Sequence, residues 1–158
     1  MNTKNRKIVI DVKIRGQLNL TLPLILGQNL NTQKRFENII MKVNKWVYGG
    51  QTFKKENVKI CKEIGSLIPE QDILVNSARF FHKLITQKES MSLHENLVIP
   101  KRAKSILYHR NPKKKLYRTS LENLITLYNQ IPHEIKTLKV KTFTKKLKKD
   151  GVEYQPAE

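Results

Sequence analysis

The acidic residues of this sequence are too few and too scattered for metal-dependent phosphoryl transfer. That chemistry needs clustered carboxylates, because hard cations that bridge phosphates require anionic oxygen ligands. The three aspartates, Asp11, Asp72 and Asp150, stand far apart in the sequence. The glycine patterns that cradle nucleotide phosphates are also absent from the sequence. We therefore expect no catalytic residue, no metal ligand and no cofactor.

The single cysteine, Cys61, excludes a disulfide within the chain. Together with four scattered histidines it also excludes a zinc site of the usual Cys/His spacing. A thiol paired with a histidine is a nucleophile in many enzymes. Cys61, however, lies beside the apolar positions of a predicted helix, which favours a buried structural thiol. One free cysteine fits an intracellular protein, nuclear or cytoplasmic.

The basic residues are the side chains that best indicate a function, and the function they favour is phosphate binding. The chain has 31 Lys and Arg against 13 Asp and Glu, a formal net charge of +18. Such an excess repels itself in the folded state and is relieved by a polyanion, so RNA or DNA is the expected partner. An anionic membrane surface and basicity without a specific partner are the alternatives. The longest apolar stretch, 20–26, is too short for a transmembrane segment.

The strongest binding candidate is a basic arm that contains no acid between residues 97 and 119. Its lysines could neutralise successive phosphates and its arginines could bond phosphate oxygens in pairs. Its two tyrosines, Tyr108 and Tyr117, could stack on unpaired bases. A solvated basic loop or a nuclear-import signal is the alternative. The cations of the arm are Lys101, Arg102, Lys104, Arg110, Lys113, Lys114, Lys115 and Arg118.

A second basic set lies near the C-terminus, on a predicted amphipathic helix. The same pattern is typical of a membrane-surface segment or a partner-docking segment. Arg79 and Lys83, on an earlier predicted helix, complete the expected nucleic-acid contacts. The C-terminal cations are Lys139, Lys141, Lys145, Lys146, Lys148 and Lys149.

The elements that must position these cations are predicted to be mainly α-helices. Apolar residues at helical spacing, with capping and glycine stop signals, predict a mainly α fold, a small helical domain of about five helices. The predicted helices cover residues 32–48, 53–64, 69–86, 120–131 and 140–149.

The first thirty residues follow a different pattern. Apolar residues occupy even positions from Ile10 to Leu26, and a period of two is typical of strands. Gly16 could mark the bend of a short N-terminal β-hairpin. A helix is the alternative for the leucine-rich part. The expected organisation is an N-terminal extension over 1–30, a helical thumb-like nucleic-acid-binding domain over 31–149 and a frayed tail over 150–158.

The C-terminal part resembles the end of reverse transcriptases from non-LTR retrotransposons. Those proteins have a helix that leads into an aromatic–Asn–x–Ile–Pro turn, followed by an Ile, a spacer and Phe–x–x–x–Leu–Lys. Upstream, the family has a Leu–Gly pair and, after a short gap, a Leu–Pro pair just before a helix. The segment FENIIMKVNKWVYGG is similar to the helix with which the family's thumb region begins. The residues that carry the resemblance are Leu127, Tyr128, Asn129, Ile131, Pro132, Ile135, Phe143, Leu147 and Lys148, and upstream Ile64, Gly65, Leu67, Pro69, Arg79, Phe81, His82 and Lys83.

The resemblance implies a thumb region that holds a template–primer duplex, over roughly residues 18–149. The family's polymerase palm, with its paired aspartates, has no counterpart in this sequence. The resemblance therefore implies a non-catalytic segment that binds RNA or an RNA–DNA hybrid, with a missing polymerase palm region as a second partner. The alternative is a free-standing structural RNA-binding protein, such as a ribosomal or ribonucleoprotein component.

Overall fold

The computed structural model describes residues 2–49, 56–87, 97–98, 107–108 and 118–156. The chain divides into two compact units, Met1–Ile73 and Leu74–Glu158, here called unit 1 and unit 2. The boundary falls within helix α5, and residue 30 lies inside unit 1. The predicted mainly α fold is confirmed.

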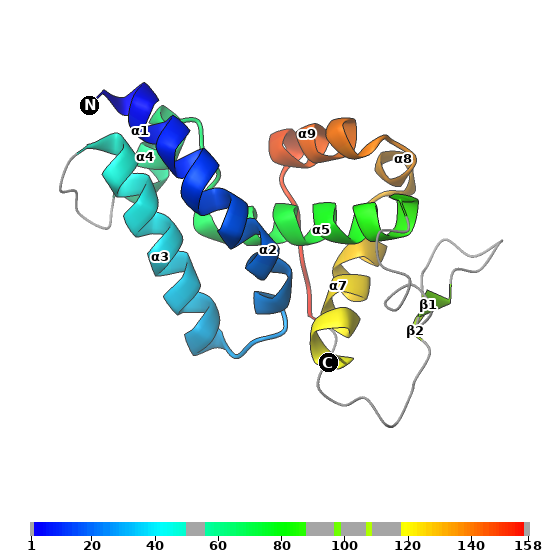
Figure 1. The fold of residues 1–158 in the computed structure, drawn as a ribbon. Helices are drawn as coiled ribbons and strands as arrows, with labels where there is room; N and C mark the ends of the chain where they lie inside the picture. The colour runs from blue at the N-terminus through cyan, green and yellow to red at the C-terminus, as the bar shows by residue number, and fades with distance from the viewer. Residues whose placement is uncertain (1, 50–55, 88–96, 99–106, 109–117, 157–158) are drawn as a thin grey trace. The chain divides into compact units, whose positions relative to one another are not determined.

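Unit 1 begins with a helical rod formed by α1 (Thr3–Ile10), the π-helix η1 (Asp11–Arg15) and α2 (Gly16–Ile25), which run on continuously (Figure 1). It continues with α3 (Leu30–Tyr48), α4 (Asn57–Glu63) and the start of α5 (Pro69–Gln87).

The prediction of N-terminal strands is wrong, because residues 3–25 are helical. Leu20 and Leu22 show why the alternation misled: Leu20 is 76% exposed and Leu22 is 1% exposed. A strand would place both side chains on one face, whereas residues two apart on a helix point in nearly opposite directions. The rod carries apolar residues on its buried side and on its exposed side, and together these produce the period of two.

Among the described residues of unit 1, buried apolar side chains form two groups. One contains Ile10, Met41, Val47, Ile60, Cys61 and Ile64, and the other contains Leu22, Ile25, Ile40 and Ile73. Arg15 ties η1 to the rest of the unit, since its guanidinium donates to Asn44 Oδ1 at 3.2 Å and to Ser66 Oγ at 3.0 Å. Burial raises the pKa of the Cys61 thiol, which fits the structural role expected for it.

Unit 2 contains the rest of α5, followed by α7 (Arg118–Gln130), α8 (His133–Lys136) and α9 (Val140–Asp150). Two short strands, β1 (Leu97–Val98) and β2 (Leu107–Tyr108), pair antiparallel, with Leu97 opposite Tyr108. The five predicted helices correspond to α3, α4, α5, α7 and α9. The short α8 is a helix that the sequence pattern did not predict.

The C-terminal tail is not frayed over residues 151–156, contrary to the prediction. Val152 is buried, and the Tyr154 hydroxyl donates to Asn123 Oδ1 at 2.7 Å. Gln130 and Gln155 exchange two hydrogen bonds of 2.7 and 2.9 Å. These bonds join the tail to α7, because Asn123 and Gln130 both lie on that helix. Among the described residues, no helix is long and apolar enough to cross a membrane.

The helical assignment of the N-terminal rod predicts very different costs for two neighbouring leucines. Leu22→Ala should lower the free energy of unfolding by about 2–5 kcal/mol, because it removes buried methyl groups and leaves a cavity. Leu20→Ala, at an exposed position, should cost about 0.5 kcal/mol or less. Urea unfolding of both variants at low protein concentration measures the difference. Equal losses would favour a strand.

Candidate nucleic-acid interface

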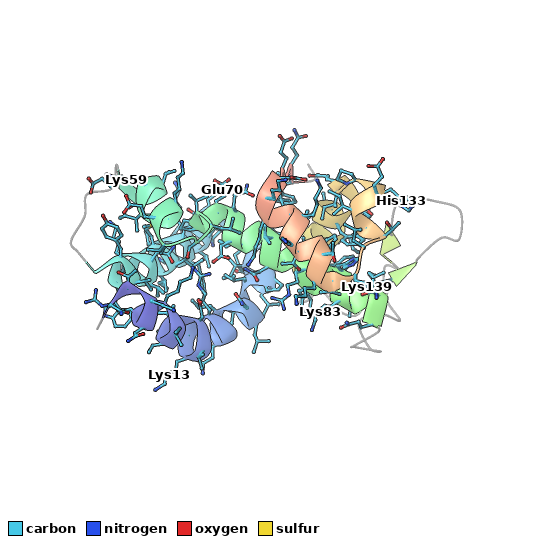
Figure 2. All side chains as sticks on the ribbon, turned by 90° about the horizontal axis from the view of Figure 1, so that it is seen from above. Lys13, Lys59, Glu70, Lys83, His133 and Lys139 are labelled. Carbon is cyan, nitrogen blue, oxygen red and sulfur yellow. The ribbon has the colours of Figure 1, made fainter. Side chains whose placement is uncertain are left out.

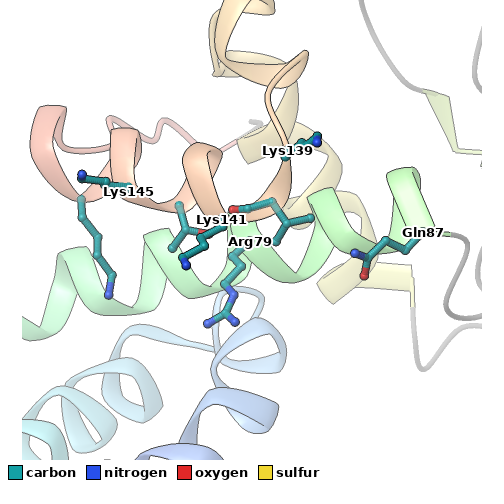
Figure 3. A pocket seen from close by; sticks show the side chains of 8 residues that line it. Arg79, Gln87, Lys139, Lys141 and Lys145 are labelled. Carbon is teal, nitrogen blue, oxygen red and sulfur yellow. Dashed lines mark hydrogen bonds between the residues drawn. The ribbon is translucent and has the colours of Figure 1, made fainter.

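A basic groove of about 740 Å³ lies between α5 and α9 in unit 2. Eight of the described residues line it, and Figure 3 shows their side chains, with Arg79 and Gln87 on α5 and the lysines at the start of α9 and along it. Five of the eight are cations and none is acidic. The full set is Arg79, Gln87, Lys139, Val140, Lys141, Thr144, Lys145 and Lys148.

The pattern of α9 explains why its lysines reach the groove. Phe143 and Leu147 stand four residues apart, so they share one helix face, and both are fully buried. With that face in the core of unit 2, the lysines of the helix remain exposed. Lys141, Lys145 and Lys148 follow at spacings of four and three residues, which places them in one row along the groove.

The groove brings together part of the predicted binding set. Arg79, Lys145 and Lys148 line it together with Lys139 and Lys141 of the C-terminal basic set. The predicted contacts Lys83, Lys146 and Lys149 are not among the lining residues. Lys146 instead pairs with Asp150 at 3.0 Å, one turn further along α9.

Most of the predicted basic arm lies outside the described residues, and its role stays a prediction. This applies to Lys101, Arg102, Lys104, Arg110, Lys113, Lys114, Lys115 and Tyr117. Tyr108 lies in β2 and Arg118 begins α7, and only their backbone is described.

A charge imbalance marks the N-terminus of α9. The first turns of helices favour acidic residues, because unpaired N–H groups give this end a partial positive charge. Here the first turn contains no acid, no side chain caps it, and Lys139 and Lys141 add further positive charge. The groove lining includes this end of the helix. Such an arrangement is stabilised by an anion.

His82 is the buried residue that connects the helices around the groove. It is fully buried on α5, and its Nε2 lies 2.8 Å from the carbonyl oxygen of Leu138. A carbonyl only accepts, so Nε2 carries the proton and Nδ1 accepts from the Tyr128 hydroxyl at 2.8 Å. The ring stacks on Phe143 of α9, with centroids 4.0 Å apart and planes 10° apart.

Burial also shifts the titration of this cluster. It lowers the pKa of His82, although the Leu138 carbonyl opposes the shift, and it raises the pKa of Tyr128 to about 12. The Lys136 ammonium lies 5.0 Å from the Tyr128 ring centroid, and burial lowers its pKa. The cluster is neutral at its centre and thus suits a structural role.

The described residues contain no group of three or more His, Cys, Asp or Glu side chains arranged to hold a metal ion. Comparison with models of known families, with curated proteins and with solved structures finds no match for this chain.

The lowered pKa of His82 predicts a pH dependence of stability. Between that pKa and 6.5, the unfolded state binds more protons than the folded state, so the stabilisation is complete above pH 6.5 and declines as pH falls. Urea unfolding between pH 7.5 and 5.5 should show this loss. His82→Gln should reduce the pH dependence, whereas His133→Gln, at an exposed histidine, should preserve it. An unchanged dependence in His82→Gln would contradict the assignment.

Proposed function

We propose that unit 2 binds the phosphate backbone of RNA or of an RNA–DNA hybrid in the basic groove. The observation that carries the proposal is the convergence of five cations from α5 and α9 on one groove, with no acid among the described residues that line it. Unit 2 as a whole has eighteen Lys and Arg against seven Asp and Glu. A polyanion offsets this excess and releases its own counterions when it binds.

The lining favours contacts with the backbone over contacts with the bases. Lys and Arg bond phosphate oxygens, whereas unpaired bases are bound mainly by stacking on aromatic rings. No aromatic side chain lines the groove within the described part of the chain, and its uncharged members are Gln87, Val140 and Thr144. Binding through this groove would therefore depend little on sequence and strongly on salt.

The row of lysines on α9 suits a repeating ligand. Residues three or four apart on a helix rise by about 4.5–6 Å, which is close to the separation of successive phosphates along one strand. Arg79 adds a planar fork from α5 that can bond two phosphate oxygens at once. The uncapped N-terminus of α9 offers backbone N–H groups to the same strand.

The resemblance to non-LTR reverse transcriptases suggests a more specific role as a thumb-like segment derived from such an enzyme. In support, the motif residues Leu127, Tyr128, Ile131, Phe143 and Leu147 are all buried core residues of unit 2. They would define the fold, while Arg79 and Lys148 supply the contacts. A thumb-like role predicts a preference for RNA–DNA hybrid over single-stranded RNA, whereas a ribonucleoprotein component would bind its RNA equally well without a DNA strand.

Two double variants, each of two lysines on α9 that are three residues apart, test the groove. Lys145→Gln/Lys148→Gln should weaken RNA binding and lower the slope of log affinity against log salt by about 1.5, at roughly 0.7–0.9 per lost phosphate contact. Lys146→Gln/Lys149→Gln removes the same charge from the same helix outside the groove lining. Fluorescence anisotropy with labelled RNA at several salt concentrations measures both. Equal effects of the two variants would contradict the groove and favour a bulk charge effect.

The basic arm predicts a second contribution to affinity. Lys113→Ala/Lys114→Ala/Lys115→Ala should lower the salt slope by about 2, because three phosphate contacts are lost. The matched control is Lys34→Ala/Lys42→Ala/Lys59→Ala, which removes three exposed lysines of unit 1. The same binding assay applies. A loss in the control as large as that in the arm variant would mean that the arm makes no specific contact.

A further inference from the structure

A row of exposed aliphatic side chains runs along the rod of unit 1. Ile8, Val12, Leu20 and Leu24 have exposed fractions between 53% and 76%. They stand four residues apart, with Gly16 in the middle of the row, and a side chain added at Gly16 would meet nothing within 4 Å. We call this row, centred on Gly16, the aliphatic ridge.

The π-helix η1 keeps the aliphatic ridge on one side of the rod. In a regular α-helix, residues four apart are rotated by about 40°, so a row at this spacing winds around the axis. A π-helix has more residues in each turn, because its hydrogen bonds run from i to i+5. Since η1 lies between Ile8 and Gly16, it removes much of that rotation. The side chains of the ridge therefore wind less around the rod than residues four apart would in a regular α-helix.

We propose that the aliphatic ridge is a dimer contact, and that its occupant is the same ridge of a second copy of this chain. Rows of residues four apart form ridges that can interlock when two helices pack against each other. The ridge is symmetric about Gly16, so a two-fold axis at this glycine makes it complementary to itself. Gly16 lets the two backbones approach, and Val12 of each copy then faces Leu20 of the other.

The distribution of charge selects this antiparallel arrangement. The first half of the rod, residues 3–15, contains six charged residues, and residues 16–33 contain none. A two-fold axis at Gly16 places the charged half of each copy against the uncharged half of the other. Figure 2 shows Lys13 pointing away from the helices of unit 1, and it would face the neutral Asn19 of the second copy. A parallel pair would instead oppose Lys13 to Lys13.

A bilayer fits the ridge less well than a second copy does. Helices that lie in a membrane interface bury a broad apolar face beneath a strongly basic polar face. The ridge is narrow: Ile14 is a further exposed aliphatic residue of the rod, at 37%, and the exposed polar residues Asn5 and Gln17 flank the ridge. Two cations of the rod are also directed inward, since Lys7 donates to the Ile64 carbonyl and Arg15 to Asn44 and Ser66.

Dimerisation would extend the proposed function, on which this consequence rests. Two copies would carry two basic grooves, so one RNA strand could engage both and bind more tightly than one groove allows. The dimer itself does not require RNA. High salt should weaken RNA binding but screen the repulsion between two strongly basic copies, so the two properties respond to salt in opposite directions.

Charge substitutions across the ridge test the proposal in the full chain, after nuclease treatment and at moderate ionic strength, where salt screens Glu–Lys pairs only partly. Leu20→Lys should lower the association constant at least about tenfold, and Val12→Glu should do likewise, because each loses an apolar contact twice in a symmetric dimer. The double variant Val12→Glu/Leu20→Lys should recover much of the association through two Glu–Lys pairs. Val58→Lys, at a position 67% exposed outside the ridge, is the matched control and should change nothing.

Sedimentation velocity over a range of concentrations measures the association, and circular dichroism checks that each variant is folded. A concentration-dependent dimer that follows the predicted pattern of loss and recovery supports the proposal. A chain that stays monomeric, a dimer that Leu20→Lys leaves intact, or a double variant without recovery would overturn it. Binding to anionic vesicles that Leu20→Lys abolishes, without any dimer, would assign the ridge to a membrane and would also overturn it.

Discussion

The ring of His82 is the centre on which the candidate interface depends. Its two nitrogens contact Tyr128 on α7 and the Leu138 carbonyl just before α9, each at 2.8 Å, and its face stacks on Phe143. A single side chain thus connects three helices and the segment that leads into α9. Both nitrogens must be satisfied because the ring is fully buried, and an unpaired polar group there would cost about 1–3 kcal/mol. The position of the α9 lysines relative to Arg79 follows from this cluster.

Unit 2 also has more positive charge around this neutral cluster than its own acidic residues balance. Lys139 and Lys141 stand where the dipole of α9 is already positive, and the part of the groove lining that the structure describes supplies no carboxylate. Folding alone gains nothing from this arrangement, because like charges repel. A bound polyanion, as in the proposed function, would offset this repulsion. Unit 1 has a different character, since the most distinctive part of its surface is an uncharged aliphatic ridge.

The sequence pattern correctly predicted the helices whose apolar residues lie on one face. It predicted the wrong structure for the rod, whose apolar residues do not lie on one face. In α9, only Phe143 and Leu147 are buried, so the helical period is clear. The rod has apolar residues both in the core and on the surface, and a period of two resulted. Arg79, Lys145 and Lys148 could be chosen by charge, but their meeting in one groove depends on the His82 contacts, which join residues 46 and 56 positions apart in the chain.

The most direct test of the central claim is a lysine footprint of the full chain with and without bound RNA. Acetylation of each lysine, read by mass spectrometry, reports which ammonium groups the RNA covers. Binding in the groove predicts strong protection of Lys141, Lys145 and Lys148, and little protection of Lys149 or of Lys59 in unit 1. Protection spread evenly over all lysines, or concentrated on Lys59 and its neighbours, would contradict a binding site in the groove between α5 and α9.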